Sequence, residues 1–289
     1  MKTNAIGTIA DKNSGVDISK VFGNYFSNTK NLDAFVSLGI APIKNNLPKS
    51  VNYIDFGGGQ GHLAFCVKEY LQTAGFKVIT TVADANDGYL ELSKKKGLET
   101  KLSNLDNVDF KDVDLITMRA VLHYNTPADQ ISILKNIFKS LKKGGYLVHQ
   151  NSSGNIENCE LRSAIVNIVE LGRAGSGNYH WASESEYEEE LKQAGFTNII
   201  HAGYAPPGTW GPESQWERFN DEKTKKAIDA GDIRSSTDLE EKRKVYLAKA
   251  YKLIGEYSSK YGKEYLGIKD LPDGKVVIEY LYPIIISRK

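Results

Sequence analysis

The sequence has 289 residues, the length of one large domain or of a domain with an addition. Its 37 Lys and Arg nearly balance its 36 Asp and Glu, so the net charge is +1, which excludes the charge character of a general nucleic-acid binder or a polybasic membrane binder. Residues 1–17 contain no apolar stretch typical of a signal peptide, so we expect a cytoplasmic protein.

The chain opens with a segment rich in aromatic residues. Residues 22–39 read FGNYFSNTKNLDAFVSLG, which favours a helix. We therefore expect residues 1–48 to form an N-terminal helical cap.

From Val51 to Asn151, apolar runs with the composition of strands alternate with segments of helical period. This alternation predicts βαβ units and a parallel sheet with helices on both faces. Strands are predicted over 51–56, 77–85, 113–118 and 146–151, and helices over 62–75, 88–97 and 129–145.

The rest of the chain predicts a helix over 183–195, a strand over 196–207 and a last strand over 276–287. An insert of residues 209–273 separates the two strands. Its middle, 236–262, is a charged helix with Ala250, Ile254, Tyr257 and Tyr261 near one face. We expect residues 206–220, rich in Pro, Gly and Trp, to form an ordered loop. The α/β core then comprises 49–208 and 274–289, with the insert as a lid.

The strongest motif follows the first predicted strand and reads Asp55-Phe56-Gly57-Gly58-Gly59-Gln60-Gly61-His62. Ligands of open α/β sheets bind at the carboxyl ends of the strands, where glycines let the backbone approach a ligand closely. Gly59-x-Gly61-x-x-Ala64 fits the dinucleotide fingerprint of NAD(P) enzymes. Asp55, however, would repel a pyrophosphate and attract an ammonium group.

The pattern Asp55-x-Gly57-x-Gly59-x-Gly61 resembles motif I of the class I S-adenosylmethionine (SAM) dependent methyltransferases. Residues 118–124 and 139–148 look like later motifs of this family, and the two late strands resemble its reversed final strand. The resemblance implies an α/β fold with a seven-stranded, mostly parallel sheet, a reversed last strand and helices on both faces. The N-terminal cap and the helical insert would be additions to this core.

The resemblance also implies a binding site for SAM. Asp55, Gly57 and Gly59 would line its methionine part, and Gly61 would serve helix packing. Asp84 would hold the ribose, although NAD enzymes use an acid in the same way. The remaining cofactor positions are Ala85 and Asn86 beside the adenine, Leu105 and Asp106 in the adenine loop, Arg119 facing the amino-acid carboxylate or the substrate, and Tyr25 closing over SAM.

Several of these residues also have structural interpretations that the sequence leaves open. Asp55 could act only as a negative charge at a helix N-terminus, and Arg119 could form an ordinary surface ion pair. Tyr25 could serve helix packing alone.

The candidate catalytic residues are His123, Tyr124, Tyr179 and His180. His123 follows a strand at the ligand end and is the best candidate base, although a hydrogen-bonded structural histidine is the commoner role for such a residue. Tyr179 and His180, with Trp181, could form an aromatic wall for the sulfonium or could anchor a loop. We find no cluster of residues with the spacing of metal ligands, and we expect no metal.

An NAD(P)-dependent enzyme stays open as an alternative, as does a SAM-sensing or structural domain without catalysis. Two reactions on SAM itself also stay open. The first is methyl transfer to a small-molecule acceptor, because the near-neutral charge argues against nucleic acid. The second is cyclisation of SAM itself with release of methylthioadenosine, as in the azetidine-2-carboxylate synthases. Trp210 and Trp216 of the insert could close the acceptor pocket or pack against a second subunit, so a homodimer is also open.

Overall fold

The computed structural model describes residues 25–104, 109–174, 177–219 and 236–289. The chain divides into two compact units. Unit 1 comprises Met1–Ser152, Glu184–Pro206 and Leu281–Lys289, and unit 2 comprises Ser153–Ser183 and Pro207–Tyr280. These boundaries differ from the predicted cap, core and insert, and that division stays a prediction.

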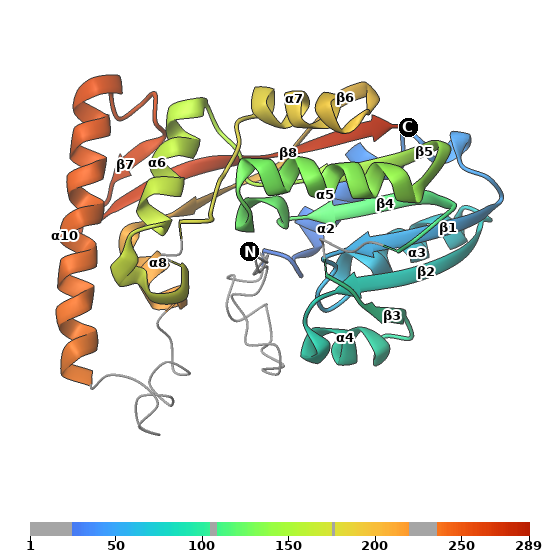
Figure 1. Cartoon of the computed structure of the whole chain (residues 1–289), viewed down its shortest axis with the longest axis horizontal. Coiled ribbons are helices and arrows are strands. Elements are labelled where there is room, and N and C mark those ends of the chain that lie inside the picture. Colours follow the sequence, from blue (N-terminus) through green and yellow to red (C-terminus); the bar gives the residue numbers. More distant parts are fainter. Residues whose placement is uncertain (1–24, 105–108, 175–176, 220–235) are drawn as a thin grey trace. The chain divides into compact units, whose positions relative to one another are not determined.

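Unit 1 is built on a sheet with the strand order β3-β2-β1-β4-β5-β8-β6 (Figure 1). Strands β3, β2, β1, β4 and β5 pair in parallel, and β8 runs antiparallel to β5. This confirms the predicted α/β fold with its reversed last strand, and among the described residues a short strand, β7 Ile268–Asp270, pairs with β8 as an eighth strand beyond the predicted seven. The strands are β1 Ser50–Phe56, β2 Lys77–Asp84, β3 Glu99–Leu102, β4 Val113–Arg119, β5 Leu141–Gln150, β6 Thr197–Trp210 and β8 Val276–Arg288.

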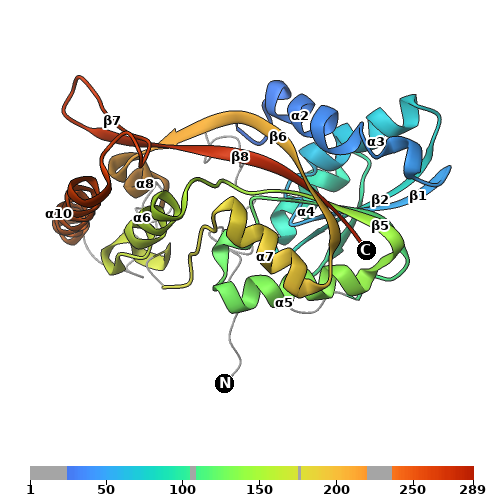
Figure 2. The same cartoon turned by 90° about the horizontal axis from the view of Figure 1, so that it is seen from above.

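Helices cover both faces of this sheet, because its central strands are apolar on both sides. In β4, every residue from Val113 to Met118 is buried. Helices α2 and α3 lie on one side of the sheet, and α5 and α7 lie on the other (Figure 2). The helices of unit 1 are α2 Thr29–Phe35, α3 His62–Thr73, α4 Asp87–Lys94, α5 Pro127–Ser140 and α7 Glu184–Ala194, with short helices η1 Val36–Ile40, η2 Lys44–Asn46 and η3 Leu122–Tyr124.

Most predicted elements are confirmed within one or two residues, but the helix expected over 129–145 ends early. Helix α5 begins after Thr126, whose hydroxyl accepts a hydrogen bond from the Asp129 amide, and it stops at Ser140. From Leu141 the chain enters β5, where Leu141 lies beside Val113 of β4. Pairing of this segment with β4 therefore outweighs the helical pattern, which continues through Lys142 and Lys143. The short strand β3 was not predicted.

The prediction of a loop over 206–220 is wrong. Strand β6 continues to Trp210, and helix α8 occupies Pro212–Phe219. Proline is favourable at the start of a helix, where its missing N–H is not needed, and Glu213 suits the positive end of the helix dipole. The Gly-Pro-Glu-Ser sequence was therefore a helix start rather than a loop.

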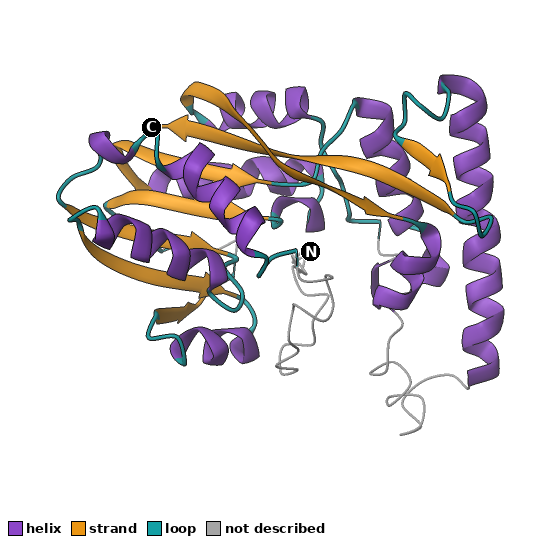
Figure 3. Ribbon diagram, turned by 180° about the vertical axis from the view of Figure 1, so that it is seen from behind, coloured by secondary structure: helices purple, strands orange, loops and turns teal. Residues whose placement is uncertain are grey.

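Unit 2 has a core of its own, built around the long helix α10, Ser236–Tyr261. The predicted helix is confirmed, with Tyr246, Ala250 and Ile254 buried on one face. The Trp216 and Tyr246 rings lie 5.6 Å apart. The other elements are α6 Ile156–Val166, η4 Val169–Ala174 and β7 Ile268–Asp270, which pairs with β8. Figure 3 shows α10 and the two long strands, β6 and β8.

The N-terminal cap is described from Tyr25 onward, and the predicted helix over 22–39 appears there as α2 followed by η1. Residues 22–24, Leu105 and Asp106 lie outside the described residues. Among the described helices, none has both the length and the apolar character needed to cross a membrane.

Candidate functional site

The glycine loop joins β1 to α3 and turns through left-handed backbone. Gly57, Gly59 and Gly61 have φ angles of +64°, +53° and +74°. A Cβ atom at Gly57 would lie 2.4 Å from Val121 Cγ2, and one at Gly58 would lie 2.6 Å from Asp55 Oδ2. Both the backbone conformation and the lack of space therefore require glycine here.

Asp84, at the end of β2, is bonded to this loop. Its Oδ2 accepts a hydrogen bond from the Gly59 amide at 2.9 Å, and its Oδ1 accepts one from the Asn86 amide at 2.9 Å. Burial raises the pKa of Asp84, while these amide bonds oppose that rise. Each carboxylate oxygen has a further lone pair, so the group can also accept bonds from a pair of ligand hydroxyls.

Asn86 begins helix α4 rather than standing free at the site. Its side-chain oxygen accepts a hydrogen bond from the Tyr89 amide at 3.2 Å, as an N-cap residue does. Ala85 lies between Asp84 and Asn86 and is half-buried. The backbone between Asp84 and α4 is therefore fixed from both ends, and contact of Ala85 and Asn86 with adenine stays a prediction.

Asp55 lies at the end of β1 and is only 1% exposed. The Thr117 hydroxyl donates to Asp55 Oδ1 at 2.6 Å, so the Tyr53 hydroxyl, 2.8 Å from Thr117, must donate to Thr117 in turn. Asp55 Oδ2 is buried and has no hydrogen-bond partner within the described part of the chain. Burial raises the pKa of Asp55 to about 6, against the lowering effects of the Thr117 bond, the Arg119 charge and the nearby Ala64 backbone amide.

Arg119 lies at the end of β4 beside these groups. Its Nη2 donates to the Phe26 carbonyl oxygen at 2.7 Å, and its guanidinium lies over the Phe26 ring at 5.1 Å. Nη1 is buried without a partner among the residues described. Burial lowers the pKa of Arg119, and the negative charge of Asp55 opposes this. Arg119 is thus an inward-facing group rather than a member of a surface ion pair.

Tyr25 belongs to an aromatic cluster next to Arg119. Its ring stacks on Tyr282 with centroids 4.1 Å apart and meets the Phe26 ring edge-on at 5.4 Å. Asn31 of α2 holds the turn by donating to the Tyr25 carbonyl oxygen at 3.0 Å. The segment before α2 therefore lies beside the site, and closure of Tyr25 over SAM stays a prediction.

His123 and Tyr124 lie in η3, directly after β4. His123 is buried, with Nδ1 3.5 Å from Asn151 Oδ1, which is a long hydrogen bond. Its ring centroid lies 4.0 Å from that of Tyr124. The two residues are thus at the carboxyl ends of the strands, as predicted, and their catalytic role is untested.

Tyr179 and His180 belong to unit 2. Asn167 fixes Tyr179 by donating to its carbonyl oxygen at 2.8 Å and accepting from its amide at 3.2 Å. The Tyr179 ring lies 5.8 Å from that of Trp181, which in turn contacts the guanidinium of the buried Arg162. The structure thus gives these aromatic residues a packing role inside unit 2, and the predicted acceptor wall stays a prediction.

The sequence motifs single out neither Thr117, which contacts Asp55, nor Gln150, a neighbour of Arg119 in the sheet. Both are polar residues at the ends of apolar strands, in LITMR and YLVHQ, which was the signal available. Thr117 orients Asp55, and Gln150 lies beside Arg119 in the sheet.

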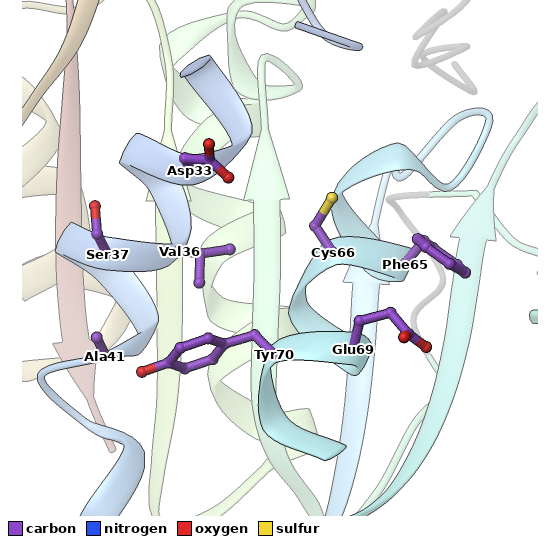
Figure 4. Close-up of a pocket in the computed structure, with 8 residues that line it drawn as sticks. All are labelled: Asp33, Val36, Ser37, Ala41, Phe65, Cys66, Glu69 and Tyr70. Atoms are coloured by element: carbon purple, nitrogen blue, oxygen red, sulfur yellow. The ribbon is translucent and has the colours of Figure 1, made fainter. Parts of the chain in front are cut away.

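A separate groove of about 530 Å³ lies between α2, η1 and α3 (Figure 4). It is lined by Asp33, Val36, Ser37, Ala41, Phe65, Cys66, Glu69 and Tyr70, and none of these is a predicted site residue. Burial raises the pKa of the Cys66 thiol, so a nucleophilic thiolate is disfavoured there.

Comparison with known proteins gives one matching family model and several similar solved structures. A family model described as a methyltransferase domain matches residues 29–201. The protein YcgJ of Bacillus subtilis has a similar structure, with a TM-score of 0.59 at 14% identity over 91% of this chain and 99% of that one. A candidate methyltransferase from Bacillus halodurans C-125 gives 0.57 at 17% identity, over 89% and 98%.

The third similar structure is phosphoethanolamine N-methyltransferase 2 of Haemonchus contortus, in complex with phosphomonomethylethanolamine and S-adenosylhomocysteine. It has a TM-score of 0.51 at 12% identity, over 97% of this chain and 60% of that one. At such identities the likeness establishes the fold alone. No curated protein matches the sequence significantly.

Proposed function

The chain belongs to the methyltransferase family, and from this premise we propose that it transfers the methyl group of SAM to a small-molecule acceptor. The observation that carries the proposal is the set of groups at the carboxyl ends of β1, β2 and β4. Asp84 is held by the glycine loop, while Asp55 and Arg119 each keep one buried polar atom without a partner among the described residues.

These groups fit the chemistry of SAM. Its amino-acid end carries an ammonium and a carboxylate on one carbon, and Asp55 Oδ2 and Arg119 Nη1 are an acceptor and a donor of the matching charges. They stand on the adjacent strands β1 and β4. Leaving either atom buried and unbonded costs stability, so a ligand that satisfies both gains that energy on binding.

The residues then have distinct tasks. Asp84 holds the ribose hydroxyls, Asp55 the ammonium, and Arg119 the carboxylate. When bound, SAM supplies a methyl group on a sulfonium, which is a good leaving group. The protein therefore mainly aligns the acceptor and excludes water. His123 takes a proton from the acceptor if its nucleophilic atom carries one.

A small acceptor is favoured over nucleic acid by the charge of the chain. A net charge of +1 offers little of the phosphate neutralisation on which nucleic-acid affinity depends. We further propose that Tyr124 contacts this acceptor.

Calorimetric titration with SAM tests the site. We expect Asp55→Ala and Asp84→Ala each to weaken binding by about 10- to 100-fold, since each removes a hydrogen-bonding charge. Asp114→Ala is the matched control, because Asp114 is a buried acid at the opposite end of β4 that accepts bonds from the Asn52 amide and Lys142. Unchanged affinity in both Asp55 and Asp84 variants would contradict the site.

Mass spectrometry of the nucleoside product tests the reaction. Methyl transfer gives S-adenosylhomocysteine, and only when an acceptor is added. Methylthioadenosine formed from SAM alone would instead establish cyclisation or cleavage of the amino-acid arm and refute transfer.

A further inference from the structure

Gln150 is a buried amide at the carboxyl end of β5. The residue is 1% exposed, yet neither its Nε2 nor its Oε1 has a hydrogen-bond partner in the described part of the chain. A buried amide without partners is costly, so the group calls for an explanation. Gln150 plays no part in the cofactor site proposed above.

The register of the sheet puts Gln150 on the same face as that site. Asp55 lies beside Thr117, and Arg119 lies beside Gln150, in two parallel strand pairs. Residues paired in this way, and those two apart along a strand, point to the same face. Asp55, Arg119 and Gln150 therefore follow one another across three adjacent strands on one face.

An aromatic residue continues this row on β8. Ile284 lies beside Gln150, and Tyr282, two residues before it, shares that face and stacks on Tyr25. An acceptor at Gln150 would thus lie near aromatic rings.

Gln150 lies one strand spacing beyond Arg119 and two beyond Asp55, the residues proposed to bind the amino-acid end of SAM. Adjacent strands lie about 4.8 Å apart, so β5 is about 10 Å from β1. The ammonium and carboxylate of SAM share one carbon and are satisfied by Asp55 and Arg119 on neighbouring strands. Gln150, one strand further out, is left for the acceptor.

An amide offers a donor and an acceptor side by side. A neutral carboxamide or lactam satisfies both, because its carbonyl accepts from Nε2 while its N–H donates to Oε1. A carboxylate would satisfy Nε2 and leave Oε1 facing a negative charge. Resting on the proposed methyltransferase function, we propose that Gln150 binds the acceptor through a carboxamide or lactam group.

The test titrates protein saturated with S-adenosylhomocysteine with three probes of similar size: benzamide, benzoate and acetophenone. Acetophenone has the carbonyl of benzamide without its N–H, and benzoate has two acceptor oxygens and a charge. We expect wild type to bind benzamide about tenfold more tightly than acetophenone, the value of one extra hydrogen bond, and to bind benzoate more weakly still.

Gln150→Met keeps the length of the side chain and removes the hydrogen bonds. We expect it to abolish the preference for benzamide, to leave the affinity for S-adenosylhomocysteine unchanged and to raise the melting temperature, since the unbonded amide is gone. Ser287→Ala is the matched control. Ser287 is a buried hydroxyl without a partner among the described residues, but it lies beside Leu147, which points to the opposite face.

The outcomes separate the two proposals. Wild type that binds S-adenosylhomocysteine but shows no preference for benzamide refutes the role of Gln150 and leaves the methyltransferase site intact. A preference for benzamide that remains in Gln150→Met also refutes the role of Gln150 and leaves the methyltransferase site intact. Wild type that binds no S-adenosylhomocysteine overturns both.

Discussion

At the scale of single residues, Asp55 shows how the site is prepared for a cation. Burial raises its pKa from 3.8 to about 6, so the folded protein holds this proton more tightly than the unfolded chain. The stability this provides, about 3 kcal/mol, is fully present below pH 4 and is lost as the pH rises through 6. At neutral pH, therefore, Asp55 is a buried carboxylate whose negative charge is only partly compensated by the protein. A bound ammonium group neutralises the rest of that charge.

The affinity for SAM should therefore depend on pH. Below pH 6 the proton competes with the ligand ammonium for Asp55, and we expect the affinity to fall by up to about tenfold for each further pH unit. Asp55→Asn, which cannot ionise, should bind weakly at every pH. Calorimetry between pH 5 and pH 8 measures both, and equal affinity of wild type at these two values would contradict the role of Asp55.

At Gly57 the glycine loop lies close to Val121, the residue before η3. We expect Gly57→Ala to lower the melting temperature and to weaken SAM binding strongly, because it adds a Cβ both to left-handed backbone and against Val121. Gly75→Ala is the control for backbone strain alone, since Gly75 has a φ of +84° with open space around it. We expect it to cost about 1 kcal/mol of stability and no affinity.

A second substitution separates strain from crowding. Gly57→Ala combined with Val121→Ala should recover part of the lost SAM affinity. If Gly57→Ala behaves like Gly75→Ala in both stability and binding, the close contact has no importance for the site.

At the scale of elements, the site is held by the starts of two helices. Gly61 is the N-cap residue of α3, and Asn86 is the N-cap residue of α4. The Asn86 side chain caps α4, and its backbone N–H donates to Asp84. The positions of Asp84 and of α4 are therefore coupled. The family resemblance implies a place for Asn86 beside the adenine, whereas its capping role is visible only in the structure.

The capping role makes a prediction for Asn86. Asn86→Ala should destabilise the protein by about 1 kcal/mol through loss of the cap, and Asn86→Asp should restore most of it. Thermal unfolding measures the stability, and calorimetry with SAM measures the affinity. An Asn86→Ala protein as stable as wild type would show that the cap contributes nothing.

At the scale of the whole molecule, two units share two strands. Strand β8 pairs with β5 in unit 1 and with β7 in unit 2, and β6 also contributes residues to both. All three tryptophans, Trp181, Trp210 and Trp216, are buried in unit 2. Tryptophan fluorescence therefore reports on unit 2, whereas the proposed SAM groups lie in unit 1.

The location of the tryptophans in unit 2 allows a test of whether the two units unfold together. Because the shared strands are continuous, we expect S-adenosylhomocysteine to raise the unfolding midpoint seen by tryptophan fluorescence as much as that seen by circular dichroism. At a ligand concentration 100 times Kd the stabilisation is about 2.7 kcal/mol. A fluorescence midpoint that stays fixed while the other rises would mean that the units unfold independently.

The sequence by itself determined the α/β architecture, the glycine loop and the placement of Asp55, Asp84 and Arg119 at strand ends, because strand and helix periods and a local motif encode them. It could not determine the end of α5, the α8 helix or the importance of Thr117 and Gln150. Those depend on which strands become neighbours: β5 beside β4 ends the helix at Ser140 and puts Gln150 next to Arg119. Register and burial are long-range properties, so only the tertiary structure decided which polar side chains share one buried face.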